Sequence, residues 1–301
     1  MKTYQQIYDI LDRFPLTQIN SHIHTHLCDG AADMTVQNIT DRAEREGLGL
    51  VILVPHFHRQ VTDGTTTLYE DSNPDIFGQL REEISYYRRH GGPVEVLLST
   101  EADILDVDGT VSLPCCPEAE QYLDFVSPTL NYHPLLPLDA VAVTHIREVD
   151  DYHQSGRFGH IARAAGGHEA VLEAAYDAMI RAIRRCPYPA MLGHFLISHT
   201  IPGRACTWFD IQPADLPLVE RKTAELLDVC AQTGAFVDLT GIHLVNCSAQ
   251  EQRAKDGFLY VYQRQTMAAM DRLGLRYFAG SDAHRLEAIG DVRAYHQLFE
   301  W

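Results

Sequence analysis

Three histidines stand at alternate positions in the segment INSHIHTHLCDG, residues 19–30, and an aspartate follows them. The histidines are His22, His24 and His26, and the aspartate is Asp29. Alternate side chains of a β-strand point to the same face, so His22 and His24 could bind one ion together. Imidazole and carboxylate in this mixture suit Zn²⁺, Mn²⁺ or Fe²⁺. The segment predicts a metal site and leaves open whether His26 or Asp29 supplies the next ligand.

Further potential metal ligands recur along the chain, each near the end of a short apolar run. They are His56, His58, Glu101, Asp103, Asn131, His133, His194, Asp238, Asp282 and His284. A single histidine is more often a surface or hydrogen-bonded core residue than a ligand, so the prediction depends on this recurrence. Asp238 is ambiguous, because its DLTG context would also suit a turn.

The apolar runs that carry these residues alternate with helical patterns. The strand-like runs span 17–26, 48–56, 94–104, 122–133, 190–195, 235–241 and 276–284. The helical patterns span 34–47, 73–91, 168–185, 215–234 and 258–274, and several end in glycine, which is favoured just after a helix. Such alternation is typical of a parallel sheet with helical crossovers, so we expect an α/β fold.

Seven strand–helix units in 301 residues, without a Pro/Gly/Ser-rich linker, favour one closed barrel domain over residues 1–301. An open doubly wound sheet is the structural alternative. In a barrel the carboxyl ends of all strands meet at one mouth, which would gather the potential ligands. The irregular stretches 58–73, 105–121 and 134–167 are then expected to be βα loops around that mouth. So many ligand groups exceed one tetrahedral site and predict two or three divalent ions about 3.5–4 Å apart.

Charge and composition limit the partners of such a site. The net charge is −17, and no run is rich in lysine and arginine, which argues against nucleic acid or a membrane surface as a partner. The seven scattered cysteines lack CxxC spacing and do not predict a disulfide framework. Residues 1–15 are typical of an amphipathic helix, not of a signal peptide, and no apolar run approaches the ~20 residues of a membrane helix. We expect a cytoplasmic protein with a small-molecule substrate and leave its oligomeric state open.

Motifs of other mechanisms are missing from the sequence. There is no GxSxG elbow, no GxGxxG after a strand, no GxxxxGK[ST] phosphate loop and no HExxH. The sequence therefore gives little support to mechanisms that do not use a metal.

The motifs HIHTHLCDG, LVILVPH, TEA, LGH and GSDAH resemble, in order and spacing, those of the PHP (polymerase and histidinol phosphatase) superfamily. The resemblance spans the whole chain and is nearest to the histidinol-phosphatase branch, because YLDFV, MLGHF and GSDAHRLEAIGD have that character. It implies a distorted (β/α)7 barrel, similar to a TIM barrel, with a trinuclear metal centre at its C-terminal face.

The resemblance also implies a ligand set. His22 and His24 would bind one metal with Asp282, and Glu101 would bridge to a second metal that His194 also binds. His56, His284 and Asp29 would hold the third. Asn131 stands where the family has a fourth-strand histidine, and His133, two residues later, is the candidate replacement; which of the two fills that position stays open.

The predicted function is hydrolysis of a small phosphate monoester, histidinol phosphate or a related phosphorylated metabolite, by a metal-bridging hydroxide. Asp282, Glu101 and Arg285 are the expected catalytic residues, with Arg285 and then Arg59 as candidates to bind the phosphate. One alternative is an amidohydrolase-like enzyme that cleaves a lactone, amide or carboxylic ester with the same centre. The other is a metal-binding PHP module without catalytic activity.

Overall fold

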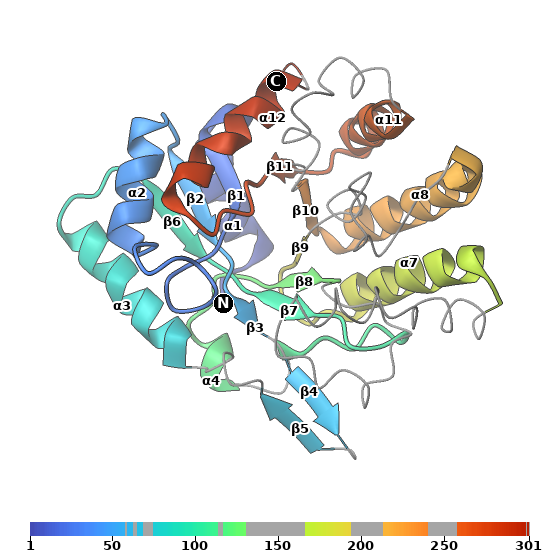
Figure 1. Ribbon diagram of the computed structural model, residues 1–301, viewed down its shortest axis with the longest axis horizontal. Helices are drawn as coiled ribbons and strands as arrows, with labels where there is room; N and C mark the ends of the chain where they lie inside the picture. Colours follow the sequence, from blue (N-terminus) through green and yellow to red (C-terminus); the bar gives the residue numbers. More distant parts are fainter. Residues whose placement is uncertain are drawn as a thin grey trace.

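The computed structural model describes residues 1–57, 59–62, 65–68, 75–113, 117–130, 166–193, 213–239, 258–298 and 300. Figure 1 shows most of the strands in the middle of the molecule. The helices α2 Val36–Arg45 and α3 Asp75–Arg89 lie on one side of them, and α7 His168–Arg185, α8 Leu216–Thr233 and α11 Phe258–Leu273 lie on the other. The predicted α/β class, with parallel strands and helical crossovers, is confirmed.

Nine described strands form three parallel ladders of three strands each. The first, in the order β1-β2-β6, contains β1 Ile19–Ile23, β2 Leu50–Leu53 and β6 Glu95–Leu98. The second, in the order β3-β7-β8, contains β3 His56–Phe57, β7 Glu101–Asp103 and β8 Ser127–Thr129. The third, in the order β11-β10-β9, contains β9 Met191–Leu192, β10 Phe236–Leu239 and β11 Tyr277–Ala279.

Two isolated parallel bridges connect these ladders. Ile23 at the end of β1 pairs with Ala283, which follows β11, and Val126 before β8 pairs with Ala190 before β9. The strands β3 and β7 begin shortly after β2 and β6 end, so they prolong those two strands. The carboxyl ends of β1, β2 and β6 and the segment that follows β11 therefore lie on the same side of the molecule.

Helices follow the strands largely as the sequence predicts. They are α1 Tyr4–Leu11, α2 Val36–Arg45, α3 Asp75–Arg89, α4 Pro117–Glu120, α7 His168–Arg185, α8 Leu216–Thr233, α11 Phe258–Leu273 and α12 Val292–Leu298, with the short 3₁₀ turns η1 Leu16–Gln18, η4 Pro213–Asp215 and η5 Leu286–Asp291. The glycines expected after α2, α3, α8 and α11 all have positive φ, between 68° and 80°. Glycine adopts this left-handed conformation without steric cost, which explains why these helices end there. No described helix combines the length and the apolar character that crossing a membrane requires.

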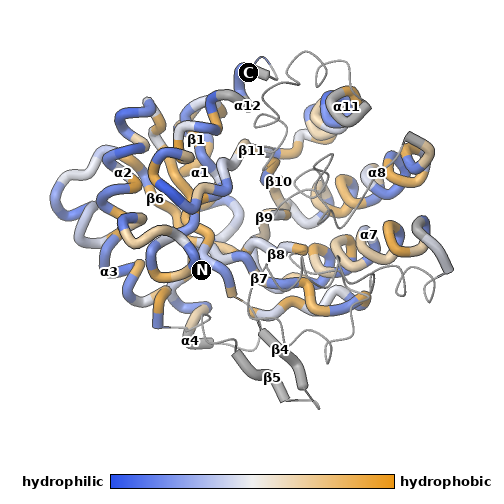
Figure 2. Tube along the Cα trace, viewed as in Figure 1, coloured by the Kyte–Doolittle hydropathy of each residue, from blue (hydrophilic) through white to orange (hydrophobic). Residues whose placement is uncertain are grey.

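The strands are buried on both faces, as in parallel sheets covered by helices. In β2, Val51 and Leu53 pack in the large core under the outer helices, whereas Leu50 and Ile52 pack in a second, smaller core. That second core also contains Ile7 and Leu11 of α1, together with residues from several other strands. Figure 2 shows the same pattern as apolar strands with helices of mixed hydropathy around them. The helix α1 therefore packs beneath the strands. In addition, Tyr4 Oη of this helix accepts a hydrogen bond from Ala190 N, just before β9.

Two predicted loops contain some regular structure, since the short helix α4 lies within 105–121 and a hairpin lies within 58–73. The stretch 58–73 was expected to be irregular, but Arg59–Thr62 and Thr65–Leu68 form the antiparallel strands β4 and β5. In the sequence, residues 63–64 are Asp and Gly, a dipeptide typical of two-residue hairpin turns. The loop prediction was wrong there because it overlooked this signal.

Candidate metal centre

His22 and His24 lie fully buried where β1 ends, with their side chains directed to one place. Their Nε2 atoms are 3.2 Å apart. Asp282 Oδ1 lies 3.0 Å from His24 Nε2 and 3.7 Å from His22 Nε2. Asp282 reaches this position because Ala283 pairs with Ile23 and its carbonyl accepts a hydrogen bond from His24 N at 3.0 Å. These three side chains can hold one metal ion.

A second group gathers around the carboxylate of Asp29. Its Oδ2 lies 2.7 Å from His284 Nε2 and 3.1 Å from His56 Nε2, and its Oδ1 lies 3.1 Å from His24 Nδ1. The rings of His24 and His284 are stacked, with centroids 4.1 Å apart. The ligand atoms of these four residues all lie within 4.8 Å of one another. His24 therefore belongs to both groups.

Glu101 lies between the two groups. Its carboxylate is fully buried, with Oε1 3.0 Å from His22 Nε2 and Oε2 2.7 Å from His56 Nδ1. This is the place that a carboxylate shared by two ions would occupy. We call the whole set the histidine–carboxylate cluster; its members are His22, His24, Asp29, His56, Glu101, Asp282 and His284.

Asp29, and not His26, is the residue that the structure brings into the cluster. His26 turns towards α3, where its Nε2 lies 3.4 Å from Glu83 Oε1 and its Nδ1 lies 3.2 Å from the carbonyl oxygen of Met34. The chain turns sharply after β1, and a Cβ on Gly30 would lie 2.7 Å from the backbone oxygen of Thr25. Glycine is required at this close approach, which places Asp29 beside the histidines.

Asp238 contributes a contact that the sequence did not settle. It is fully buried in β10, where Oδ2 lies 2.7 Å from His22 Nδ1 and Oδ1 accepts a hydrogen bond from Ser21 Oγ at 2.6 Å. The signal in the sequence was a charged residue within the apolar strand AFVDL, which demands a buried partner. The structure thus places Asp238 behind His22, in a strand, and the turn interpretation is wrong.

Asn20 was missed altogether. Its Oδ1 accepts hydrogen bonds from Ser281 N at 3.0 Å and His22 N at 3.2 Å, and its Nδ2 donates to Ser281 Oγ at 2.8 Å. These bonds connect the start of β1 to Ser281, the residue before Asp282. Asp282 itself has a φ of 51°, which is a left-handed conformation. The only signal in the sequence was a polar amide inside a strand, and this signal did not indicate that Asn20 contacts Ser281.

The carboxylates control the protonation of two buried histidines. Burial alone would lower the pKa of His22, but Glu101 and Asp238 outweigh burial and raise this pKa well above the ordinary value. Burial likewise opposes the charge of His56, whereas Glu101 and Asp29 raise its pKa well above the ordinary value. Without metal, both rings therefore favour the protonated form.

The same balance acts around Asp29. Burial would raise the pKa of this carboxyl, but the neighbouring histidines, His24 first, hold it below its usual range. Burial opposes the charge of His284, whereas Asp29 and then Asp282 raise its pKa. In the absence of metal, the negative charges of the cluster are thus balanced by protons on its histidines.

The cluster fits divalent metal ions by its donors and by its unmet hydrogen bonds. Imidazole nitrogen and carboxylate oxygen are the ligands that Zn²⁺, Mn²⁺ and Fe²⁺ share. The Nδ1 atom of His24 is buried and makes no aligned hydrogen bond within the described residues, although Asp29 is close. A buried nitrogen of this kind is costly unless something binds it, and a metal ion would do so.

Other predicted site residues lie at the edge of the cluster or outside the described residues. Arg285 directly follows His284, is exposed, and precedes η5. Arg59 begins β4. Outside the described residues lie His58, Asn131, His133 and His194.

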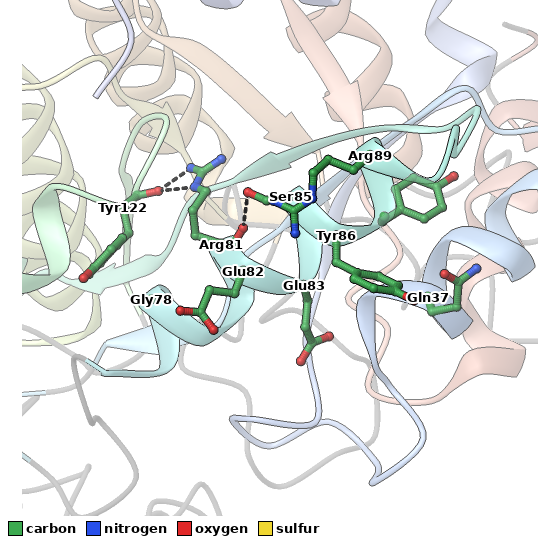
Figure 3. Close-up of a pocket in the computed structure, with 10 residues that line it drawn as sticks. Gln37, Gly78, Arg81, Glu82, Glu83, Ser85, Tyr86, Arg89 and Tyr122 are labelled. Atoms are coloured by element: carbon green, nitrogen blue, oxygen red, sulfur yellow. Dashed lines mark hydrogen bonds between the residues drawn. The ribbon is translucent and has the colours of Figure 1, made fainter.

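A separate hollow of about 950 Å³ lies along α3 (Figure 3). Arg81, Glu82 and Tyr86 line it, and Arg81 Nε donates to the carbonyl oxygen of Tyr122 at 2.8 Å. The guanidinium of Arg81 is also 3.2 Å from Asp124. None of the residues that line this hollow belongs to the histidine–carboxylate cluster, so we assign it no part in the chemistry.

Comparison with known proteins relates this arrangement to a family. Residues 263–294 match the PHP-associated family model, PHP_C. Among curated proteins, none matches the chain by sequence. The histidinol phosphate phosphatase of Lactococcus lactis subsp. lactis, solved with zinc, L-histidinol and phosphate, has a similar structure with a TM-score of 0.57 at 13% identity, over 94% of this chain and 93% of that one. The putative histidinol phosphatase of Listeria monocytogenes has a TM-score of 0.60 at 15% identity, over 90% of this chain and 97% of that one.

The sequence match is confined to the C-terminal part, whereas the similarity of fold extends over nearly the whole chain. Both comparisons agree with the resemblance that the motifs predicted, which is confirmed. Residues 263–294 thus resemble the PHP-associated family, and the fold of the chain resembles that of these two proteins.

Proposed function

We propose that this protein is a metal-dependent hydrolase of phosphate monoesters. The observation that carries the proposal is the histidine–carboxylate cluster, in which residues from distant parts of the sequence converge where parallel strands end. Enzymes with parallel strands place their chemistry at these carboxyl ends. The fold shared with two histidinol phosphatases supports the same reaction class.

Two or three divalent ions, of zinc, manganese or iron, would bind in the cluster. His22, His24 and Asp282 would hold one ion, and Asp29, His56 and His284 another. Glu101 would be shared, because its two oxygens face His22 and His56. His194, and either His133 or Asn131, would add ligands from further strands.

A single closed (β/α)7 barrel over residues 1–301 would bring those strands to the same mouth. The bridges Ile23–Ala283 and Val126–Ala190 support it, because they join the three ladders at both junctions that such a barrel needs. In this arrangement α1 lies beneath the strands and the cluster lies at their other end.

When bound, such ions lower the pKa of coordinated water and neutralise phosphate oxygens. The protein supplies the rest. Asp282 is half-buried at the edge of the cluster, where its carboxylate would orient the attacking water and hold its proton. Glu101 is fully buried and would keep the negative charge needed to hold the ions. Arg285, exposed beside His284, would bind the phosphate of the substrate.

Histidinol phosphate, or another small phosphorylated metabolite, is the proposed substrate. The similar Lactococcus protein binds L-histidinol and phosphate together, which supports a ligand with both parts.

The test combines metal analysis with a screen for phosphate release. Protein purified without chelator should contain at least two metal ions per chain and release phosphate from one or more phosphorylated metabolites when Mn²⁺ or Zn²⁺ is added. His24→Ala should abolish both properties, because His24 belongs to both ligand groups. His90→Ala, an exposed histidine of the α3 terminus, is the matched control and should change neither. Fewer than two ions, together with no phosphate released from any compound, would overturn the proposal.

A further inference from the structure

His22 uses its two ring nitrogens in different directions. Its Nε2 faces the cluster, 3.0 Å from Glu101 Oε1 and 3.7 Å from Asp282 Oδ1. Its Nδ1 faces away and lies 2.7 Å from Asp238 Oδ2. Asp238 is in neither ligand group. The imidazole of His22 thus lies between Glu101 and Asp282, which face the metal site, and Asp238, which does not.

The partner carboxylate is itself held in place. Ser21 Oγ donates to Asp238 Oδ1 at 2.6 Å, and all three side chains are fully buried. Asp238 and His22 come from β10 and β1, which are not paired; in the third ladder β10 pairs with β11, and the segment after β11 pairs with the end of β1. The contact therefore passes across the space between two strands that are not neighbours.

We propose that Asp238 is a positioning residue of the metal centre, an inference that rests on the proposed function. It accepts a hydrogen bond from the Nδ1–H of His22, so the lone pair for metal binding stays on Nε2 and points at the cluster. A carboxylate behind a ligand histidine fixes the tautomer and the ring orientation, and makes the ligand nitrogen more basic.

Packing alone does not account for this carboxylate. A charge in the core costs free energy through lost hydration, and an apolar side chain of similar volume is often as stable or more so. Asp238 has apolar neighbours in β10, Val237 and Leu239, which belong to the large core. A carboxylate at this position is therefore better explained by what it does to His22.

The first test measures metal affinity. Zn²⁺ or Co²⁺ is titrated into metal-free protein in competition with a chromophoric chelator. Asp238→Ala should weaken the affinity by about 10–100-fold, the usual cost of losing a partner behind a metal ligand. Asp238→Asn should lose less, because the amide oxygen can still accept from His22 while the amide nitrogen donates to Ser21. Ser21→Ala, which only removes the hydroxyl that orients Asp238, should also weaken binding.

A matched control separates positioning from stability. Thr223→Val removes buried hydrogen bonds to the Tyr176 and Tyr262 hydroxyls, among α7, α8 and α11. It should lower Tm to an extent comparable with the Asp238 variants but leave metal affinity at the wild-type value. Wild-type affinity in Asp238→Asn, Asp238→Ala and Ser21→Ala alike would overturn the proposal.

The second test needs no metal and keeps the inference separate from the proposed function. In metal-free protein labelled with ¹⁵N-histidine, the Nδ1–H proton of His22, identified by its loss in His22→Gln, should be shifted downfield and slow to exchange. It should exchange rapidly in Asp238→Ala and persist in Thr223→Val. If the wild type binds no metal but this proton behaves as expected, the proposed function fails while the Asp238–His22 hydrogen bond stands. If the proton is absent or exchanges rapidly in the wild type, the positioning role is wrong.

Discussion

His56 and Glu101 are register partners on the neighbouring parallel strands β3 and β7, and His56 Nδ1 lies 2.7 Å from Glu101 Oε2. The other oxygen of Glu101 faces His22 on β1. A single buried carboxylate thus connects histidines of two strands, and the two halves of the candidate metal centre meet at it.

The first prediction follows from this connection. Glu101→Gln keeps the shape of the side chain but removes the charge that both histidines face, so the affinity for a second ion should fall. We expect at least one ion fewer per chain by elemental analysis and a loss of phosphatase activity of about 10³-fold or more, since the shared ligand serves both ions. Glu120→Gln, at the end of α4, is a charge-matched control and should retain metal and activity. Full metal content in Glu101→Gln would contradict a shared carboxylate.

A second prediction concerns pH. His22, His56 and His284 have raised pKa values in the metal-free fold, so their ion pairs stabilise it fully below the unfolded-state pKa of histidine, and this stabilisation is lost as pH rises through the raised values. Metal requires the neutral rings, so its affinity rises over the same interval. The difference in Tm between metal-loaded and metal-free protein should therefore grow as pH rises above the ordinary histidine pKa of about 6.5. A constant or shrinking difference would contradict the proton–metal exchange.

Asn20 gives a third prediction. Asn20→Ala would leave the Ser281 amide without its buried acceptor and remove two donated bonds, so the free energy of unfolding should fall by about 2–4 kcal/mol. Metal affinity should fall as well, because Asp282 follows Ser281. Asn38→Ala, which removes an exposed bond to the Asp33 carbonyl, should cost far less. Urea unfolding and metal titration of both variants measure the difference.

The role of Arg285 is the fourth prediction, and it discriminates between substrate classes. Arg285→Ala should lower kcat/KM for phosphate monoesters by about 10–100-fold while the ions stay bound, because a charge-assisted hydrogen bond is worth about 1.5–3 kcal/mol. Arg89→Ala, an exposed arginine of α3, is the control and should be neutral. Unchanged phosphatase kinetics in Arg285→Ala would instead favour the hydrolysis of a lactone, amide or ester by the same centre.

The spacing of apolar residues and the glycines at helix ends were enough to predict the main strands and helices. The apolar runs coincide with the parallel strands, and Gly47, Gly91, Gly234 and Gly274 mark helix ends where only a left-handed residue continues the chain without strain. The prediction failed at the β4–β5 hairpin, where the turn signal was read as loop. A local sequence pattern therefore predicted the structure reliably wherever one physical requirement, such as a left-handed residue after a helix, determined that pattern.

The fine geometry of the site could not be predicted in the same way. Alternation suited His26 as well as Asp29, and only the turn at Gly30 directs His26 to Glu83 and Asp29 to the cluster. The pairing of Asp238 with His22 joins strands that are not neighbours, so no local pattern could reveal it. Contacts of this kind depend on the order of strands in the sheet, which a single sequence does not encode in any local segment.

Asp282 shows what this arrangement costs the molecule. Its φ of 51° would suit glycine better, and only the nearby histidines, with His24 Nε2 at 3.0 Å and His284 Nδ1 at 3.9 Å from its Oδ1, offset that strain in the absence of metal. At a pH high enough to neutralise these histidines, Asp282→Gly should therefore raise the Tm of the metal-free protein while removing a ligand and the activity with it. Thermostability and turnover thus make opposite demands on position 282. Selection for heat resistance alone would replace this metal ligand, and abolish the activity, before it changed the fold.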